Sequence, residues 1–131
     1  MNGVDVITKV STVVQQWDGV VISPFRVGGV SFRVNRREIG HLQREGMADL
    51  LFPVRVRRQL VAAGFADAHR ALPKSGWVSF LVQNEFDVPA IVDLLRLNYE
   101  LIRGLFPDTE SAPSVRRATR YIRRLPADLI A

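Results

Sequence analysis

The sequence has no cysteine and only two histidines, His41 and His69. The absence of cysteine excludes disulfides, thiolate metal sites and a cysteine nucleophile, and it agrees with a reducing compartment. No segment approaches the roughly 20 apolar residues that a membrane-spanning helix needs. The first residues also lack the basic start and the apolar run of a signal peptide. We therefore expect a cytoplasmic protein that does not bind a membrane.

Lysine is also scarce, since sixteen of the eighteen basic residues are arginine. The charge is unevenly placed: residues 111–131 contain five arginines and one acid, whereas residues 1–110 contain thirteen basic and twelve acidic residues. The five are Arg116, Arg117, Arg120, Arg123 and Arg124. A helix over 114–125 would group most of them on one side. Such a segment is suited to the phosphates of a nucleic acid or to an acidic protein partner, unless it is simply a solvated face.

The chain has the length of one domain, 131 residues, and an ordinary globular composition with 47% apolar and 24% charged residues. We assign residues 1–106 to a single compact domain. Residues 107–131 follow as a linker and a basic C-terminal segment.

Apolar spacing in the first half of the chain predicts one helix and four short strands. The helix ends before Asp18, and its apolar residues recur every three or four positions. They are Val4, Ile7, Val10, Val14 and Trp17. The strands are predicted over residues 20–22, 30–34, 37–42 and 47–52. Asn35-Arg36 is a tight connection, so it makes the second and third strands an antiparallel pair.

Strict alternation along residues 37–42 assigns each side chain to a face of its strand. It places Arg37 and His41 on one face, together with Gln43, and Glu38 on the other. Gly40 indicates a bulge or a close approach of another backbone.

The second half predicts a helix, a loop, a strand and a final helix. The first helix runs from Pro53 to Gly64 and the loop spans 67–74. The strand over 77–82 turns Trp77 and Ser79 to the face opposite Val78. The last helix is expected to be capped by Asp87, with Pro89 in its first turn. The order is roughly α-β-β-β-(β)-α-β-α plus the basic helix. It predicts an α+β fold with a small antiparallel sheet packed against helices.

Several short motifs resemble one family. They are Arg36-Arg37-Glu38-Ile39-Gly40-His41-Leu42, then His69 and Pro73, then Trp77-Val78-Ser79-Phe80-Leu81 and Leu97-Asn98-Tyr99. This pattern resembles the luciferase domain of bioluminescent fungi, and it is more similar still to small bacterial proteins of unknown function that share the domain. The resemblance implies a cofactor-independent oxygenase that acts with molecular oxygen on a hydroxypyrone.

One position departs from the family pattern, in which the strand carries His-x-His. The first histidine matches His41, but Gln43 stands in the second place. Glutamine forms hydrogen bonds but does not exchange a proton at pH 7. The resemblance implies that there is no cofactor. We also expect no metal, because two histidines without a carboxylate at ligand spacing are a weak metal signal.

The candidate catalytic residues are His41 and His69, one as a general base and the other as a hydrogen-bond donor to a ligand oxygen. The candidate ligand-binding residues are Arg37, Glu38, Gln43, Trp77 and Ser79. Arg37 would bind an anionic or enolic oxygen, and Trp77 would stack on a flat ligand with Ser79 as a nearby donor.

Each of these roles has a structural alternative. His41 would be a half-buried strand residue and His69 an exposed loop residue. Trp77 would pack under the first helix, and Arg37 and Glu38 would form a solvated edge. Asp49 either orients one of the histidines or caps a turn.

Three functions are compatible with these observations. We favour a small-molecule site near His41, His69 and Trp77, with an oxygenase-type activity as one form of it. The alternative is a non-enzymatic module that binds a nucleic acid or an acidic protein through its basic C-terminal segment. A third is a scaffold that forms a homodimer through an exposed apolar patch.

Overall fold

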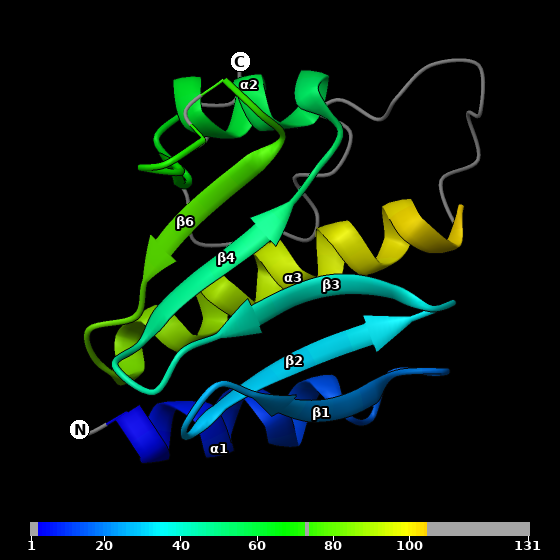
Figure 1. Cartoon of the computed structure of the whole chain (residues 1–131), viewed down its shortest axis with the longest axis vertical. Helices are drawn as coiled ribbons and strands as arrows, with labels where there is room; N and C mark the ends of the chain where they lie inside the picture. The colour runs from blue at the N-terminus through cyan, green and yellow to red at the C-terminus, as the bar shows by residue number, and fades with distance from the viewer. Residues whose placement is uncertain (1–2, 73, 105–131) are drawn as a thin grey trace.

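The computed structural model describes residues 3–72 and 74–104 (Figure 1). Its helices are α1 (Gly3–Val14), α2 (Val54–Ala62) and α3 (Val88–Arg103), with one 3-10 turn η1 (Glu85–Asp87) before α3. Its strands are β1 (Val21–Phe25), β2 (Gly29–Val34), β3 (Arg37–Leu42), β4 (Met47–Leu51), β5 (Asp67–Ala68) and β6 (Trp77–Leu81). All neighbouring strands are antiparallel, in the order β1-β2-β3-β4-β6-β5. The predicted α+β class is confirmed.

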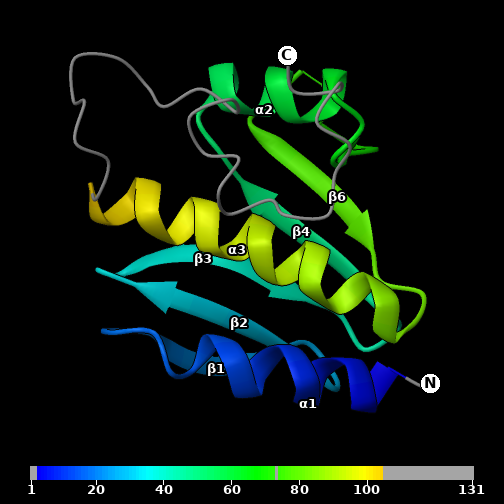
Figure 2. The same ribbon diagram turned by 180° about the vertical axis from the view of Figure 1, so that it is seen from behind.

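The sheet has one covered face. Helices α1 and α3 lie side by side across it, and α2 lies at one end of β4 and β6 (Figure 2). The core between the sheet and these helices contains Val10, Phe32, Leu50, Ile91 and Leu95, each at most 2% exposed. Burial of such apolar surface is the main stabilising contribution to a fold of this size. The opposite face of the sheet carries polar side chains, and it holds the candidate site.

Two elements differ from the sequence prediction because pairing within the sheet overrides local signals. Strand β1 continues through Ser23-Pro24, which the sequence suggested as its end. Proline is tolerated there because β1 is the edge strand. In the predicted loop over 67–74, Asp67 and Ala68 pair with β6 and form the short strand β5.

The predicted cap of α3 is also wrong in detail. Asp87 precedes α3 but makes no capping hydrogen bond to it. Its carboxylate instead accepts hydrogen bonds from the backbone N–H groups of Gln83 and Asn84, while Asn84 caps the 3-10 turn. Pro89 lies in the first turn of α3, as predicted.

A β-bulge in β3 changes the faces assigned to its residues. Phe32 is paired with Gly40 and Arg33 with Glu38, so Ile39 is the extra residue in β3. Ile39 and Gly40 are therefore both buried on the core side, and Glu38 shares the open face with His41. The assignment of Glu38 to the face opposite His41 is wrong for this reason. The assignment of Arg37 to the face of His41 is wrong as well, because Arg37 pairs with Val34, whose side chain belongs to the core.

The prediction that Gly40 marks a bulge or a close approach is confirmed. A Cβ at Gly40 would lie 2.9 Å from side-chain atoms of both Leu50 and Leu95. The tight connection at Asn35-Arg36 is confirmed as well, since both residues have positive φ, 51° and 63°.

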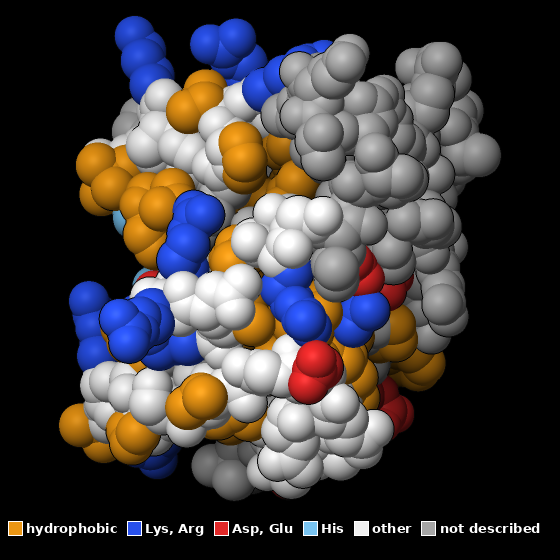
Figure 3. All heavy atoms as spheres, turned by 90° about the vertical axis from the view of Figure 1, so that its right-hand side faces the viewer, with side chains coloured by type: hydrophobic (Ala, Val, Ile, Leu, Met, Phe, Trp, Pro, Cys, Tyr) orange, Lys and Arg blue, Asp and Glu red, His pale blue; other side chains and the backbone are white. Residues whose placement is uncertain are grey.

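The described residues, 3–72 and 74–104, include no helix with the length and apolar character required to cross a bilayer. The predicted linker and basic helix over 107–131, with their five arginines, lie outside the described residues. In Figure 3, the Lys and Arg side chains on one side of the molecule form several separate groups among apolar and other side chains.

Candidate functional site

Strand pairing aligns a row of polar side chains across the open face of the sheet. Ser31 of β2 pairs with His41 of β3, which pairs with Asp49 of β4, which pairs with Ser79 of β6. Directly opposed residues on neighbouring strands share a face, and their side chains meet. The prediction that Ser79 and Trp77 lie on the face opposite Val78 agrees with this row, since Ser79 contacts Asp49 and Val78 is buried.

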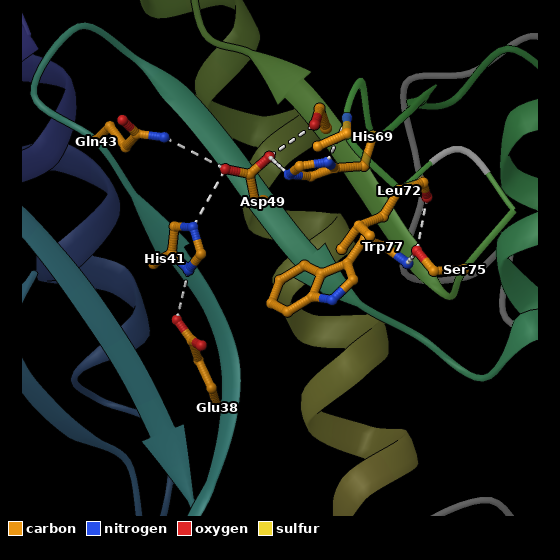
Figure 4. A network of polar contacts seen from close by, with 10 residues as sticks. Glu38, His41, Gln43, Asp49, His69, Leu72, Ser75 and Trp77 are labelled. Atoms are coloured by element: carbon orange, nitrogen blue, oxygen red, sulfur yellow. Dashed lines mark hydrogen bonds and ion pairs between the residues drawn. The ribbon is translucent and has the colours of Figure 1, made fainter.

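Asp49 is the centre of a hydrogen-bond network (Figure 4). Its Oδ1 accepts a hydrogen bond from Ser79 Oγ at 2.6 Å. Its Oδ2 lies 3.1 Å from His41 Nε2 and accepts a weaker bond from Gln43 Nε2 at 3.4 Å. Burial by itself raises the pKa of the Asp49 carboxyl, but the bonds from His41 and Ser79 outweigh it and lower that pKa below its usual value. Asp49 is therefore a carboxylate at neutral pH.

His41 lies between two carboxylates. Its Nδ1 is 2.7 Å from Glu38 Oε1, and Ser31 Oγ donates to the same oxygen at 3.2 Å. Burial lowers the pKa of His41, but the hydrogen bonds to Asp49 and Glu38 and their charges more than offset it and raise the pKa to about 9. Both ring nitrogens donate, so the ring is an imidazolium at neutral pH. The charged ring has no lone pair with which to accept a proton. Its contribution to the site is its positive charge and the position in which it holds the two carboxylates.

His69 lies in the connection between β5 and β6 and approaches Asp49 from the other side. The backbone N–H of Ala71 donates to its Nδ1 at 3.1 Å, so the proton of the neutral ring is on Nε2. That nitrogen is 3.8 Å from Asp49 Oδ1, which is longer than a hydrogen bond. The Nε2–H of His69 therefore lies beside Asp49, too far for a good hydrogen bond to it, and His69 lines both of the cavities described below.

Aromatic rings border the network. Phe25, at the end of β1, is stacked on the His41 ring with centroids 4.0 Å apart and an angle of 19°. The Trp77 ring is tilted against both histidines, 5.8 Å from His41 and 6.1 Å from His69. The alternative that Trp77 packs under the first helix is wrong, because β6 turns it to the open face (Figure 4). Trp17 instead packs against Tyr99 of α3, with centroids 5.3 Å apart.

Two adjoining cavities open on this face, and both are lined by Gln43, Asp49 and His69. The first has a volume of about 390 Å³ and is otherwise lined by Phe25, Arg26, His41, Leu72 and Trp77. The second has a volume of about 560 Å³ and is otherwise lined by Glu45, Met47, Asp67, Ala68, Arg70, Ser79 and Leu81. Several residues around the first cavity have aromatic rings, and the second is bordered by a mixture of charged, polar and apolar side chains. A largely apolar surface with a few polar groups is typical of a small-molecule site.

The structure thus brings together His41, Gln43, His69, Trp77 and Ser79, with Glu38 behind His41. Arg37 is exposed and lines neither of these two cavities. Among the described residues, no group of three or more histidines and carboxylates is arranged to hold a metal ion.

Sequence reasoning missed Phe25 and Ser31 and left the role of Asp49 open. Ser31 could not be placed from the hairpin alone, because a regular hairpin with the turn at Asn35-Arg36 would pair His41 with Val30. The bulge at Ile39 brings Ser31 opposite His41 instead. Phe25 follows a proline that signalled the end of a strand, so no local pattern placed it beside His41.

The fold and this network define an α+β protein with a one-sided antiparallel sheet and a histidine–carboxylate site on its open face. Residues 36–98 match the family model described as Luciferase domain, so this part of the chain is similar to that family. The resemblance noted from the motifs is thereby confirmed. The matched segment contains His41, Asp49, His69 and Trp77 and ends at Asn98. No curated protein and no solved structure matches the chain.

Proposed function

We propose that the two adjoining cavities bind a small, flat, partly apolar molecule that carries oxygen substituents. The observation that carries this proposal is the convergence of Trp77 with both histidines, at 5.8 and 6.1 Å, around a cavity open to solvent. Aromatic walls with a few directed polar groups are the usual composition of such sites.

Each side chain has a distinct role in this proposal. Trp77 supplies a flat apolar surface for the ring of the ligand. The Nε2–H of His69 and the amide of Gln43 donate hydrogen bonds to its oxygens. His41 does not contact the ligand through a free nitrogen, because both of its nitrogens are bonded to carboxylates. It fixes Asp49, and Asp49 in turn fixes Gln43 and Ser79.

The activity implied by the family is a cofactor-independent oxygenation of a hydroxypyrone. In such a reaction the substrate itself supplies the electrons to molecular oxygen, so its electron-rich enolate has to be stabilised. Donors at His69 and Gln43 would stabilise the charge that develops on the enolic oxygen. We propose these two residues, rather than Arg37, for that contact, because Arg37 is outside both cavities.

Tryptophan fluorescence tests ligand binding directly, because the chain has only two tryptophans. In a Trp17→Phe variant, Trp77 is the single reporter, and we expect saturable quenching by a 4-hydroxy-2-pyrone. In the matched Trp77→Phe variant, Trp17 reports from the opposite face and its emission should not change. Equal quenching in both variants, or none in Trp17→Phe, contradicts the proposed site. Oxygen uptake with the same pyrone then separates turnover from binding alone.

A further inference from the structure

We propose that Asn98 is a positioning residue for the site, although it lies on the opposite face of the sheet. It holds the bulge of β3 in the one arrangement that turns Glu38 toward His41. This inference goes beyond the proposed function, because it concerns how the network is assembled and holds whatever ligand binds there.

The contacts of Asn98 join two strands to α3. Its side-chain nitrogen donates to the backbone oxygen of Ile39 in β3 at 2.7 Å and to that of Leu51 in β4 at 3.1 Å. Both hydrogens of the amide nitrogen are used in this way. The residue is only 1% exposed, so solvent does not compete for these bonds.

Strand pairing explains why these two carbonyls need a partner outside the sheet. β3 and β4 pair only at His41–Asp49 and Leu42–Ala48. Ile39 is the bulged residue and Leu51 ends β4, so neither oxygen has a place in a ladder between β3 and β4. A buried carbonyl without a donor is strongly disfavoured. Asn98 supplies that donor at the point where the two strands separate.

Packing around the bulge leaves little freedom to rearrange. The neighbouring Gly40 is so close to Leu50 and Leu95 that a single added carbon would be 2.9 Å from each. If the bulge were lost, strict alternation would return Glu38 to the core side, away from His41 Nδ1. Asn98 does not contact His41, so its effect on the imidazole passes through the backbone of β3 and the side chain of Glu38.

The titration of His41 is a readout that a purely structural role for Asn98 would not change. The titratable or charged groups that face this ring are Glu38 and Asp49, with His69 and Arg26 farther out. In an Asn98→Leu variant, which keeps the number and branching of the side-chain heavy atoms but has no donor, Glu38 should move from Nδ1. We expect the pKa of His41 to fall from about 9 by at least one unit, a tenfold loss of proton affinity, in an NMR titration without ligand.

Matched variants separate positioning from general destabilisation. Ile91→Val removes one methyl group from a buried position on the same helix, and it should leave the His41 titration unchanged. In a Glu38→Gln background, replacement of Asn98 should produce little further shift, because the two residues then act through the same contact. If Asn98→Leu does not fold, Asn98→Ala, which also has no side-chain donor, is measured instead.

The inference is overturned if His41 titrates as in the unmodified protein when Asn98 is replaced by either residue. It is also overturned if Ile91→Val produces the same shift. Since no ligand is present in these titrations, a failure of the proposed binding function would show in the fluorescence experiment and not here.

Discussion

Asp49 is the residue on which the site depends most. The Asp49 side chain is only 7% exposed, and its carboxylate is hydrogen-bonded to His41, Gln43 and Ser79. In an Asp49→Asn variant, the amide keeps the shape but leaves the buried imidazolium with one counter-charge. We expect a loss of about 3 kcal/mol in the free energy of unfolding, measured by urea denaturation.

The control for this substitution is Asp67→Asn. Asp67 also belongs to the row of paired residues next to Ser79, but it is exposed. Its replacement should change the stability by less than about 0.5 kcal/mol. Equal losses in the two variants would contradict a central role for Asp49.

The pKa of His41 gives the stability a definite pH dependence. The folded-state pKa of about 9 lies above the ordinary histidine pKa of 6.5, so the folded protein retains this proton more strongly. The contribution of this proton to the free energy of unfolding is fully present below pH 6.5 and is lost as the pH rises through about 9. We expect the urea midpoint to fall over this range, and to fall less in a His41→Gln variant. A midpoint that does not change with pH in the unmodified protein would contradict the imidazolium assignment.

Residue identities alone predicted part of this site. Trp77 and Ser79 lie on one face because they alternate in β6, and Gln43 follows His41 on the same face because alternation continues past the end of β3. Glu38 was placed on the wrong face, because a bulge depends on the pairing partner and on the core behind it. That information is distributed over β2, β4 and α3 and is not present in residues 37–42.

At the scale of elements, the bulged strand β3 is the feature that local patterns could not supply. The strands themselves, the hairpin turn and the helices were predictable from periodicity and from Gly and Pro positions. The two-residue strand β5 was not, since its only support is its pairing with β6. Pairing across the sheet therefore decides both the edges of the fold and the orientation of Glu38.

Gly40 makes this dependence on packing measurable. A methyl group at this position would lie 2.9 Å from side-chain atoms of Leu50 and Leu95 and 3.2 Å from the backbone oxygen of Asp49. We expect Gly40→Ala to destabilise the protein by about 1–3 kcal/mol in urea denaturation. In a Leu95→Ala background the added methyl group has space, so its cost should be smaller. Simple additivity of the two substitutions would show that the crowding at Gly40 is not with Leu95.

At the scale of the whole molecule, the open face of the sheet separates the site from the helices that stabilise the fold. α1 and α3 cover one face, and the luciferase-like segment contributes the site strands β3 to β6 on the other. The family and the fold class were accessible from the motifs and their order. The contribution of Phe25 was not, because it comes from outside the matched segment and is brought in by β1.

The basic C-terminal segment supports a separate prediction that rests on sequence alone. With five arginines and one acid in residues 111–131, the full chain should be retained on a polyanion column and released by salt. Removal of these residues should abolish the retention. Elution of both proteins at the same low salt concentration would remove the case for a nucleic-acid or acidic partner. Light scattering similarly tests the predicted homodimer, which a monomeric mass would contradict.

Two carboxylates, those of Glu38 and Asp49, hold His41 as an imidazolium beside the proposed ligand cavity. The most direct test is a ¹⁵N NMR measurement of the two histidine rings in the unmodified protein. At pH 7.5 we expect both nitrogens of His41 to carry protons, with titration near pH 9. A His41 ring with one bare nitrogen at pH 7.5, titrating at or below pH 6.5, would contradict the account.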